Sequence, residues 1–310
     1  MGEVSAGGDP WEQQDETLTL QDYFEKEYLP DAKHRKKSWY EDERIFRQHL
    51  LPVYGTKSLS DFTTLDIVRL RKKWLASDPR PANQTINLRL GTLRTALNRA
   101  RREGFMRHNP FEGVKAMPLD NQRIRYLDAD ELPRFLDELR KLSEEDWLRR
   151  VLTLLLMTGM RAGEAMSLRW EQIHPNRRQI RLYDAKAGSR IVHLPADLAD
   201  SMQRWRETSR SEWVFPSHRD PSKPMYGKVH TPRWRKLLRD ANITDFRVHD
   251  LRHSAATYAR MAGADLSTVA RMLGHKTLQM TQRYAHVADS EVQAAVESVA
   301  GRLGRATKEA

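Results

Sequence analysis

Residues 107–126 interrupt the sequence with a stretch that can hold neither a long helix nor a long strand. The stretch contains Pro110, Gly113 and Pro118 and has no lasting hydrophobic period. Prolines and glycines spaced in this way end regular structure, so we expect an interdomain linker. A chain of 310 residues is long enough for two domains that each bury a core. The chain is therefore expected to fold as two domains, residues 17–106 and residues 127–288.

The first of these domains is predicted to be a small bundle of four helices. Leu20, Tyr23 and Tyr28 recur at helical spacing, and Pro30 is expected to end that helix. Further helices are expected over residues 35–51, after a cap at Thr63 or Thr64, and between Pro81 and Gly104.

The second domain is predicted to be mixed. Asp128 and Glu131 have the spacing of a capping box at the start of a helix. Residues 179–183 and 190–194 alternate like two strands around a Gly188–Ser189 turn. Helices are expected near residues 129–141, 145–158, 196–208, 228–241, 249–262, 265–273 and 289–302. The fold class is therefore mainly α with a small antiparallel sheet (α+β).

The charge of the chain indicates a polyanionic partner. The formal net charge is +11, divided into −5 in residues 1–16, +9 in residues 17–126 and +7 in residues 127–310. The acidic leader, residues 1–16, has no apolar segment typical of a signal peptide and is expected to be disordered. Without cysteine there is no disulfide framework or thiolate metal site, and no apolar run is long enough to span a membrane. We expect a soluble protein in a reducing cytoplasm.

Two candidate functional residues precede the last helices. Arg161 lies between Gly159 and Gly163, at a junction of helices, and Glu164 can hold it so that it is aimed at a phosphate. Lys186 lies in the turn between the two predicted strands, where it can reach a ligand. Each feature alone is more commonly a surface ion pair or a solvated lysine.

The remaining candidate functional residues are three histidines, an arginine and a tyrosine nearer the C-terminus. His249, Arg252 and His253 crowd one helix face, and the cation Arg252 favours an anion there over a metal. His275 follows Gly274, which is expected to end a helix, and Tyr284 lies nine residues after His275. Taken singly, His275 and Tyr284 are more commonly structural.

Together these residues describe attack on a phosphodiester. Fixed guanidinium and imidazole donors stabilise the charge that develops on the non-bridging oxygens without a metal. A lysine can protonate the leaving alkoxide. Since a covalent phosphotyrosine conserves the bond energy, no cofactor is expected.

The ordered motifs resemble those of the tyrosine recombinases, the phage integrase family. They are Thr-Gly-Met-Arg-Ala-Gly-Glu at 158–164, the hairpin lysine, His-Asp-Leu-Arg-His at 249–253, Leu-Gly-His at 273–275 and the later tyrosine. The resemblance extends from about Thr17 and implies a C-shaped clamp on DNA, made of a SAM-like helical core-binding domain and a mixed catalytic domain.

The resemblance also implies roles for individual residues. Arg161 and Arg252 match the arginines that clamp the phosphate, and Lys186 matches the general acid for the 5′-hydroxyl. His249 and His275 match the histidines that assist at the phosphate, and Tyr284 matches the nucleophile that forms a 3′-phosphotyrosyl link. Glu164 and His253 match supporting positions.

The expected partners are double-stranded DNA, a homotetramer of this chain in the synaptic complex, and accessory DNA-bending or directionality factors. Many such integrases carry an arm-binding domain before the core-binding domain, so the chain is expected to be either armless or truncated. Residues 289–310 are expected to form a helix and tail that dock in trans. Basic residues expected on the DNA are Lys33, Arg35, Lys36, Lys37, Arg89, Arg94, Arg99, Arg101 and Arg102.

The sequence therefore predicts a site-specific integrase that acts on the bacterial nucleoid. Two alternatives are a type IB topoisomerase, which relaxes DNA through a similar tyrosine, and a DNA-binding regulator that has lost catalysis.

Overall fold

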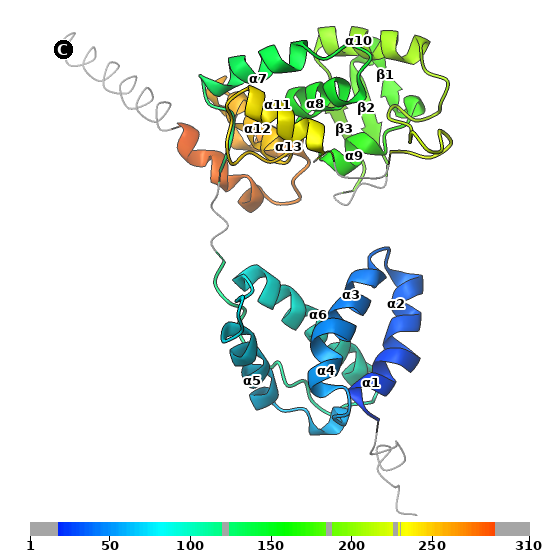
Figure 1. The fold of residues 1–310 in the computed structure, drawn as a ribbon, viewed down its shortest axis with the longest axis vertical. Coiled ribbons are helices and arrows are strands. Elements are labelled where there is room, and N and C mark those ends of the chain that lie inside the picture. Colours follow the sequence, from blue (N-terminus) through cyan, green and yellow to red (C-terminus); the bar gives the residue numbers. More distant parts are fainter. Residues whose placement is uncertain (1–17, 120–123, 184–187, 226–228, 230, 289–310) are drawn as a thin grey trace, which may run out of the picture. The chain divides into compact units, whose positions relative to one another are not determined.

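The computed structural model describes residues 18–119, 124–183, 188–225, 229 and 231–288 (Figure 1). The chain divides into two compact units, Met1–Asn121 and Gln122–Ala310, and each is described by itself. The predicted leader, the predicted C-terminal helix and Lys186 lie outside the described residues.

The first unit is helical, as the apolar spacing predicts. Thr63 caps α5 in a capping box with Asp66, and α6 ends two residues before Gly104. Its helices are α1 (Leu20–Tyr23), η1 (Phe24–Tyr28), α2 (Leu29–Arg35), α3 (Trp39–Ile45), η2 (Phe46–Leu50), α4 (Leu51–Tyr54), η3 (Leu59–Asp61), α5 (Thr64–Leu75) and α6 (Asn83–Arg102).

Pro30 does not end the first helix, so that prediction is wrong. The five residues before Leu29 form a π-helical turn, η1, in which the Leu29 N–H donates to the Phe24 carbonyl five residues back. Pro30 then sits in the first turn of α2, where a missing N–H costs least. The same arrangement recurs at Pro52, because the Leu51 N–H donates to the Phe46 carbonyl across η2.

The segment after α6 packs back on that helix. The Asn87 side chain exchanges hydrogen bonds with the backbone of Met117, and an Arg94 Nη donates to the Val114 carbonyl at 2.6 Å. Residues 114–117 fall in the predicted linker, but these hydrogen bonds attach them to α6 and so to the first unit.

The second unit is mostly helical with one small sheet. Its helices are α7 (Glu131–Arg140), α8 (Trp147–Thr158), α9 (Ala162–Met166), η4 (Trp170–Gln172), η5 (Pro175–Arg177), α10 (Ala196–Glu207), α11 (Pro232–Asp240), α12 (Asp250–Met261), α13 (Leu266–Leu273), η6 (Leu278–Met280) and η7 (Gln282–Ala288). The strands β1 (Ile173–His174), β2 (Gln179–Leu182) and β3 (Arg190–His193) form an antiparallel sheet in the order β1-β2-β3.

The two predicted strands are confirmed as β2 and β3. They pair with Leu182 opposite Arg190 and Ile180 opposite Val192. The short strand β1 was not predicted, because two residues carry no readable period. The fold class, mainly α with a small antiparallel sheet, is confirmed.

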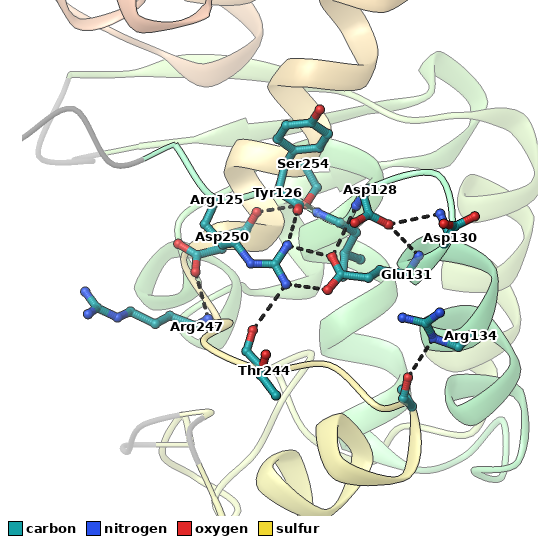
Figure 2. A network of polar contacts seen from close by, with 12 residues as sticks. Arg125, Tyr126, Asp128, Asp130, Glu131, Arg134, Thr244, Arg247, Asp250 and Ser254 are labelled. Atoms are coloured by element: carbon teal, nitrogen blue, oxygen red, sulfur yellow. Dashed lines mark hydrogen bonds and ion pairs between the residues drawn. The ribbon is translucent and has the colours of Figure 1, made fainter.

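A polar network fixes the entry of the chain into the second unit (Figure 2). Arg125 binds the Glu131 carboxylate with two Nη atoms and also donates to the Thr244 carbonyl at 3.2 Å. The Leu127 N–H donates to the Ser254 hydroxyl of α12 at 2.9 Å. Since these contacts reach the first residue of α7 and Ser254 of α12, they help to set the position of the helix that carries Arg252 and His253.

Candidate active site

Arg161 is positioned by a helix junction. Gly159 ends α8 in the left-handed conformation with φ 65°, and Arg161 is the N-cap residue of α9. Glu164 accepts from the Arg161 backbone N–H and from its Nη1, both at 3.0 Å. The predicted Arg161–Glu164 pair is therefore confirmed, and the carboxylate fixes both the backbone and the guanidinium of Arg161.

A second arginine shares Glu164. Arg190, the first residue of β3, donates from Nη2 to Glu164 Oε2 at 2.6 Å and from Nη1 to the Met272 carbonyl at 3.0 Å. Burial alone would raise the pKa of Glu164, but the Arg161 N–H and the Arg190 charge outweigh it and lower that pKa. Glu164 is thus a largely shielded carboxylate that links two cations.

Arg252 is buried within α12, with 3% of its surface exposed. It donates from Nη1 to the Gly159 carbonyl at 2.6 Å and from Nη2 to the Leu273 carbonyl at 2.7 Å. Burial, together with the charge of Arg161, lowers the pKa of Arg252 to about 10. A guanidinium has five N–H donors, so these two bonds fix its plane without using all of its donors.

Tyr284 lies buried against α12. Its side chain is 1% exposed and packs with Ala256, Val269 and Leu273. Its hydroxyl lies 2.6 Å from Nδ1 of His253, and the rings of His249 and His253 meet edge to face at 5.2 Å. The predicted histidine face of α12 therefore faces the predicted nucleophile.

His275 leaves the end of α13 beside this cluster. Gly274 ends α13 with φ 66°, as predicted, and His275 Nδ1 lies 2.7 Å from the Thr281 hydroxyl. Thr281 is fully buried, so it fixes the ring of His275 from the segment that leads into η7.

The histidines of the site are held in the neutral form. Burial and the neighbouring His249 lower the pKa of His253 to about 4. Burial and the charge of Arg252 lower the pKa of His275 to about 4. Burial raises the pKa of Tyr284 although Arg283 and Arg252 oppose it, so the phenol keeps its proton at neutral pH.

The structure brings together most of the predicted site. Arg161, Arg252 and His275 interact electrostatically, and His253 contacts Tyr284 directly. Within the described residues, no group of three or more histidines, aspartates and glutamates could hold a metal.

The basic residues predicted to contact DNA fall into two groups. Lys37, Arg101 and Arg102 are exposed, and Lys33 lies over the Trp39 ring. Arg35 is also exposed and pairs with Asp31 within its own helix, whereas Lys36 pairs with Asp42, and Arg99 with Asp31 and Glu103. Arg94 lies over the Phe111 ring and Arg89 over the Trp74 ring. The exposed residues can reach phosphates, whereas the residues that form ion pairs or lie over aromatic rings also stabilise the first unit.

Sequence reasoning missed Arg190 and Thr281. A signal for Arg190 was present. Side chains alternate between the two faces of a strand, so Arg190 lies on the same face as Val192 and Leu194, which are buried. An arginine in that register needs a carboxylate or carbonyls as partners. Thr281 carried no signal, since its role depends on where α13 places His275.

Two family models match the chain. Residues 125–291 match the phage integrase family, and residues 19–75 match the phage integrase N-terminal SAM-like domain. The integrase of Salmonella phage P22 is 27% identical over 88% of this chain and 75% of that protein. The tyrosine recombinase XerC of Corynebacterium glutamicum is 25% identical over 80% of this chain and 82% of that protein.

Solved structures share the fold. The Tn1549 transposon integrase in complex with transposon right end DNA superposes with a TM-score of 0.71 at 18% identity, covering 91% of this chain and all of that one. A lambda integrase tetramer bound to a Holliday junction gives a TM-score of 0.65 at 20% identity, covering 88% and 83%. The chain belongs to the phage integrase family, and this membership supports the activity of a site-specific DNA recombinase.

No helix among the described residues is long and apolar enough to cross a membrane.

Proposed function

We propose that this chain cleaves and rejoins DNA strands at specific sites through a tyrosine–DNA link formed by Tyr284. The observation that supports this most is the contact between the Tyr284 hydroxyl and His253 on the helix that also carries Arg252. A buried tyrosine with a neutral imidazole acceptor beside fixed guanidinium groups has the parts needed for attack on a phosphodiester.

The reaction transfers a phosphoryl group of the DNA from the 5′-oxygen to the phenol oxygen of Tyr284. Tyr284 Oη gives its proton to His253 Nδ1 and forms a bond to the scissile phosphorus while the bond to the 5′-oxygen breaks, which leaves a 3′-phosphotyrosine and, once the 5′-oxygen is protonated, a 5′-hydroxyl. Arg161, Arg252 and His275 stabilise the charge on the non-bridging oxygens. Lys186 protonates the 5′-oxygen in this proposal, and His249 assists at the phosphate. Attack by a 5′-hydroxyl on the phosphotyrosine reverses these steps and joins strands.

His253 prepares the nucleophile. With a pKa of about 4, the His253 imidazole is neutral at pH 7. When the ring proton is on Nε2, Nδ1 accepts a hydrogen bond from the Tyr284 hydroxyl. Protonation of His253 would remove this acceptor. Glu164 supports the site differently, because it orients Arg161 and contacts no reacting atom.

The proposed partners follow from the family. The chain acts on double-stranded attachment sites, and four copies assemble at synapsis with residues 289–310 docked in trans. Accessory bending or directionality factors set the direction of recombination. We place this activity in the bacterial cytoplasm, on the nucleoid. The phage integrase SAM-like match supports recombination over topoisomerase activity, and the complete set of charged site residues supports catalysis over a purely regulatory role.

The test is covalent capture. A library of nicked duplexes with a randomised core, from which the cleaved end is lost, traps the covalent adduct and identifies the site. Tyr284→Phe is expected to bind the selected duplex and form no adduct. Tyr258→Phe is the matched control, since it removes the hydroxyl of a tyrosine on α12 that donates to the Leu127 carbonyl, away from the site. An adduct that persists in Tyr284→Phe refutes the assignment of the nucleophile.

A further inference from the structure

We propose that Arg190 is a positioning residue for DNA cleavage, which holds Arg161 and the end of α13 in the geometry that receives the phosphate. This inference rests on the proposed function. It concerns a residue outside the motifs, on the strand that follows the hairpin of Lys186.

The first contact acts on Arg161. Arg190 and the Arg161 backbone N–H both donate to Glu164 Oε2, and Arg161 Nη1 donates to Oε1. With Arg190 present, the carboxylate shares its charge between two cations. Without Arg190, the carboxylate would pair more strongly with Arg161 and would compete with the phosphate for that guanidinium.

The second contact acts on Arg252 and His275. Arg190 Nη1 donates to the Met272 carbonyl, and the next carbonyl, that of Leu273, accepts from Arg252 Nη2. His275 follows two residues later. Arg190 therefore fixes the stretch of backbone that orients two of the proposed phosphate-binding groups.

The end of α13 is shaped around Arg190. A Cβ on Gly274 would lie 2.7 Å from both Nε and Nη1 of Arg190, closer than such atoms approach, and Gly274 also has φ 66°. Only glycine meets both conditions at this position. The close approach shows that the guanidinium is packed against the backbone rather than tethered loosely over it.

The alternative is that Arg190 only stabilises the fold. Its side chain is 9% exposed and that of Glu164 is 11% exposed, so the pair is largely shielded from solvent. The same unit offers a matched control, the pair Arg169–Glu212, which has a similar distance of 2.7 Å but is 39% and 52% exposed. Exposed pairs of this kind contribute little, so Arg169→Met removes an arginine–glutamate pair without touching the site.

The test separates positioning from folding by changing the substrate. Full-length wild type, Arg190→Met, Arg190→Lys and Arg169→Met are compared in single-turnover cleavage of the captured nicked duplex. A second duplex carries a neutral methylphosphonate at the scissile position, which lacks the ionic oxygen that the arginines hold. DNA affinity and thermal unfolding are measured for every variant.

We expect Arg190→Met to cleave the phosphate duplex roughly 10- to 100-fold more slowly than wild type, with DNA affinity within about threefold. On the methylphosphonate duplex the two proteins should cleave within about threefold of each other, because a displaced Arg161 matters less there. Arg190→Lys should recover part of the rate, and Arg169→Met should match wild type.

Three results would overturn the proposal. They are an equal loss on both substrates, a loss that follows the melting temperature across the variants, and full activity of Arg190→Met. If Arg190→Met does not fold, the comparison of the two substrates is made with Arg190→Lys, and an equal loss there has the same meaning. Absence of any adduct with wild type would instead overturn the proposed function and this inference together.

Discussion

His253→Gln should reduce the loss of folding stability that wild type shows as the pH falls from 7 to 4.5. The pKa of His253 falls from 6.5 to about 4 in the folded protein, through burial first and through His249 and Arg283 next. Between these two pH values the unfolded chain binds more protons than the folded one at this side chain. The contribution of His253 to stability is therefore present above pH 6.5 and is lost as the pH falls toward 4.

The size of the effect follows from the shift. One pH unit corresponds to about 1.4 kcal/mol, so wild type should lose about 2–3 kcal/mol at this site between pH 7 and pH 4.5. His253→Gln cannot take up that proton. Glutamine can still accept from the Tyr284 hydroxyl, so its cost at pH 7 should be about 1 kcal/mol.

Urea unfolding at pH 7.0, 5.5 and 4.5 measures the difference. Because the two units can unfold separately, the transition to compare is the one that His253→Gln shifts at pH 7. The free energies of unfolding of wild type and His253→Gln should become equal near pH 5.5, and at pH 4.5 His253→Gln should be the more stable protein by about 1–2 kcal/mol. His193→Gln, which removes an exposed histidine of β3, controls for the loss of an imidazole. Parallel curves for wild type and His253→Gln would refute the reasoning, as would titration of His253 near 6.5 by NMR.

Further measurements address the backbone of the site, DNA binding and assembly. Gly159→Ala should lower the free energy of unfolding by about 1–3 kcal/mol, because Gly159 has φ 65°; an unchanged thermal transition would contradict this. Alanine at both Arg101 and Arg102 should reduce the slope of log affinity against log salt by about 2, measured by fluorescence anisotropy. Arg94→Ala should change that slope less, since its guanidinium holds a backbone carbonyl, and equal effects would count against the distinction. Removal of residues 289–310 should impair synapsis more than binding to a single site, and an unaffected synapse in native gels would refute docking in trans.

Local signals were sufficient for much of the fold. The cap at Thr63, the capping box from Asp128 to Glu131, and the helix ends at Gly159 and Gly274 are formed by residues close in sequence. Such features depend on short-range hydrogen bonds and on the freedom of glycine to adopt positive φ. They can therefore be predicted before any tertiary structure is known.

Contacts between distant residues were the part that could not be predicted. The spacing of His249, Arg252 and His253 places them on one helix, but only the tertiary fold brings Tyr284 to His253. Arg190 was readable as a charged residue in a buried register, yet nothing local names Glu164 as its partner. The wrong prediction at Pro30 has a different origin, because the usual rule for proline assumes α-helical hydrogen bonding on both sides.

The two π-helical turns have a consequence for sequence comparison. A π turn holds one residue more than the α turn it replaces, and one residue corresponds to a rotation of about 100° around the helix axis. Deleting a single residue within Phe24–Tyr28 would therefore turn Leu20 and Tyr23 away from the core that they now occupy. Relatives that cross this region with an ordinary α-helix should show a one-residue gap here, and another at Phe46–Leu50. An alignment forced through without those gaps would pair buried positions with exposed ones.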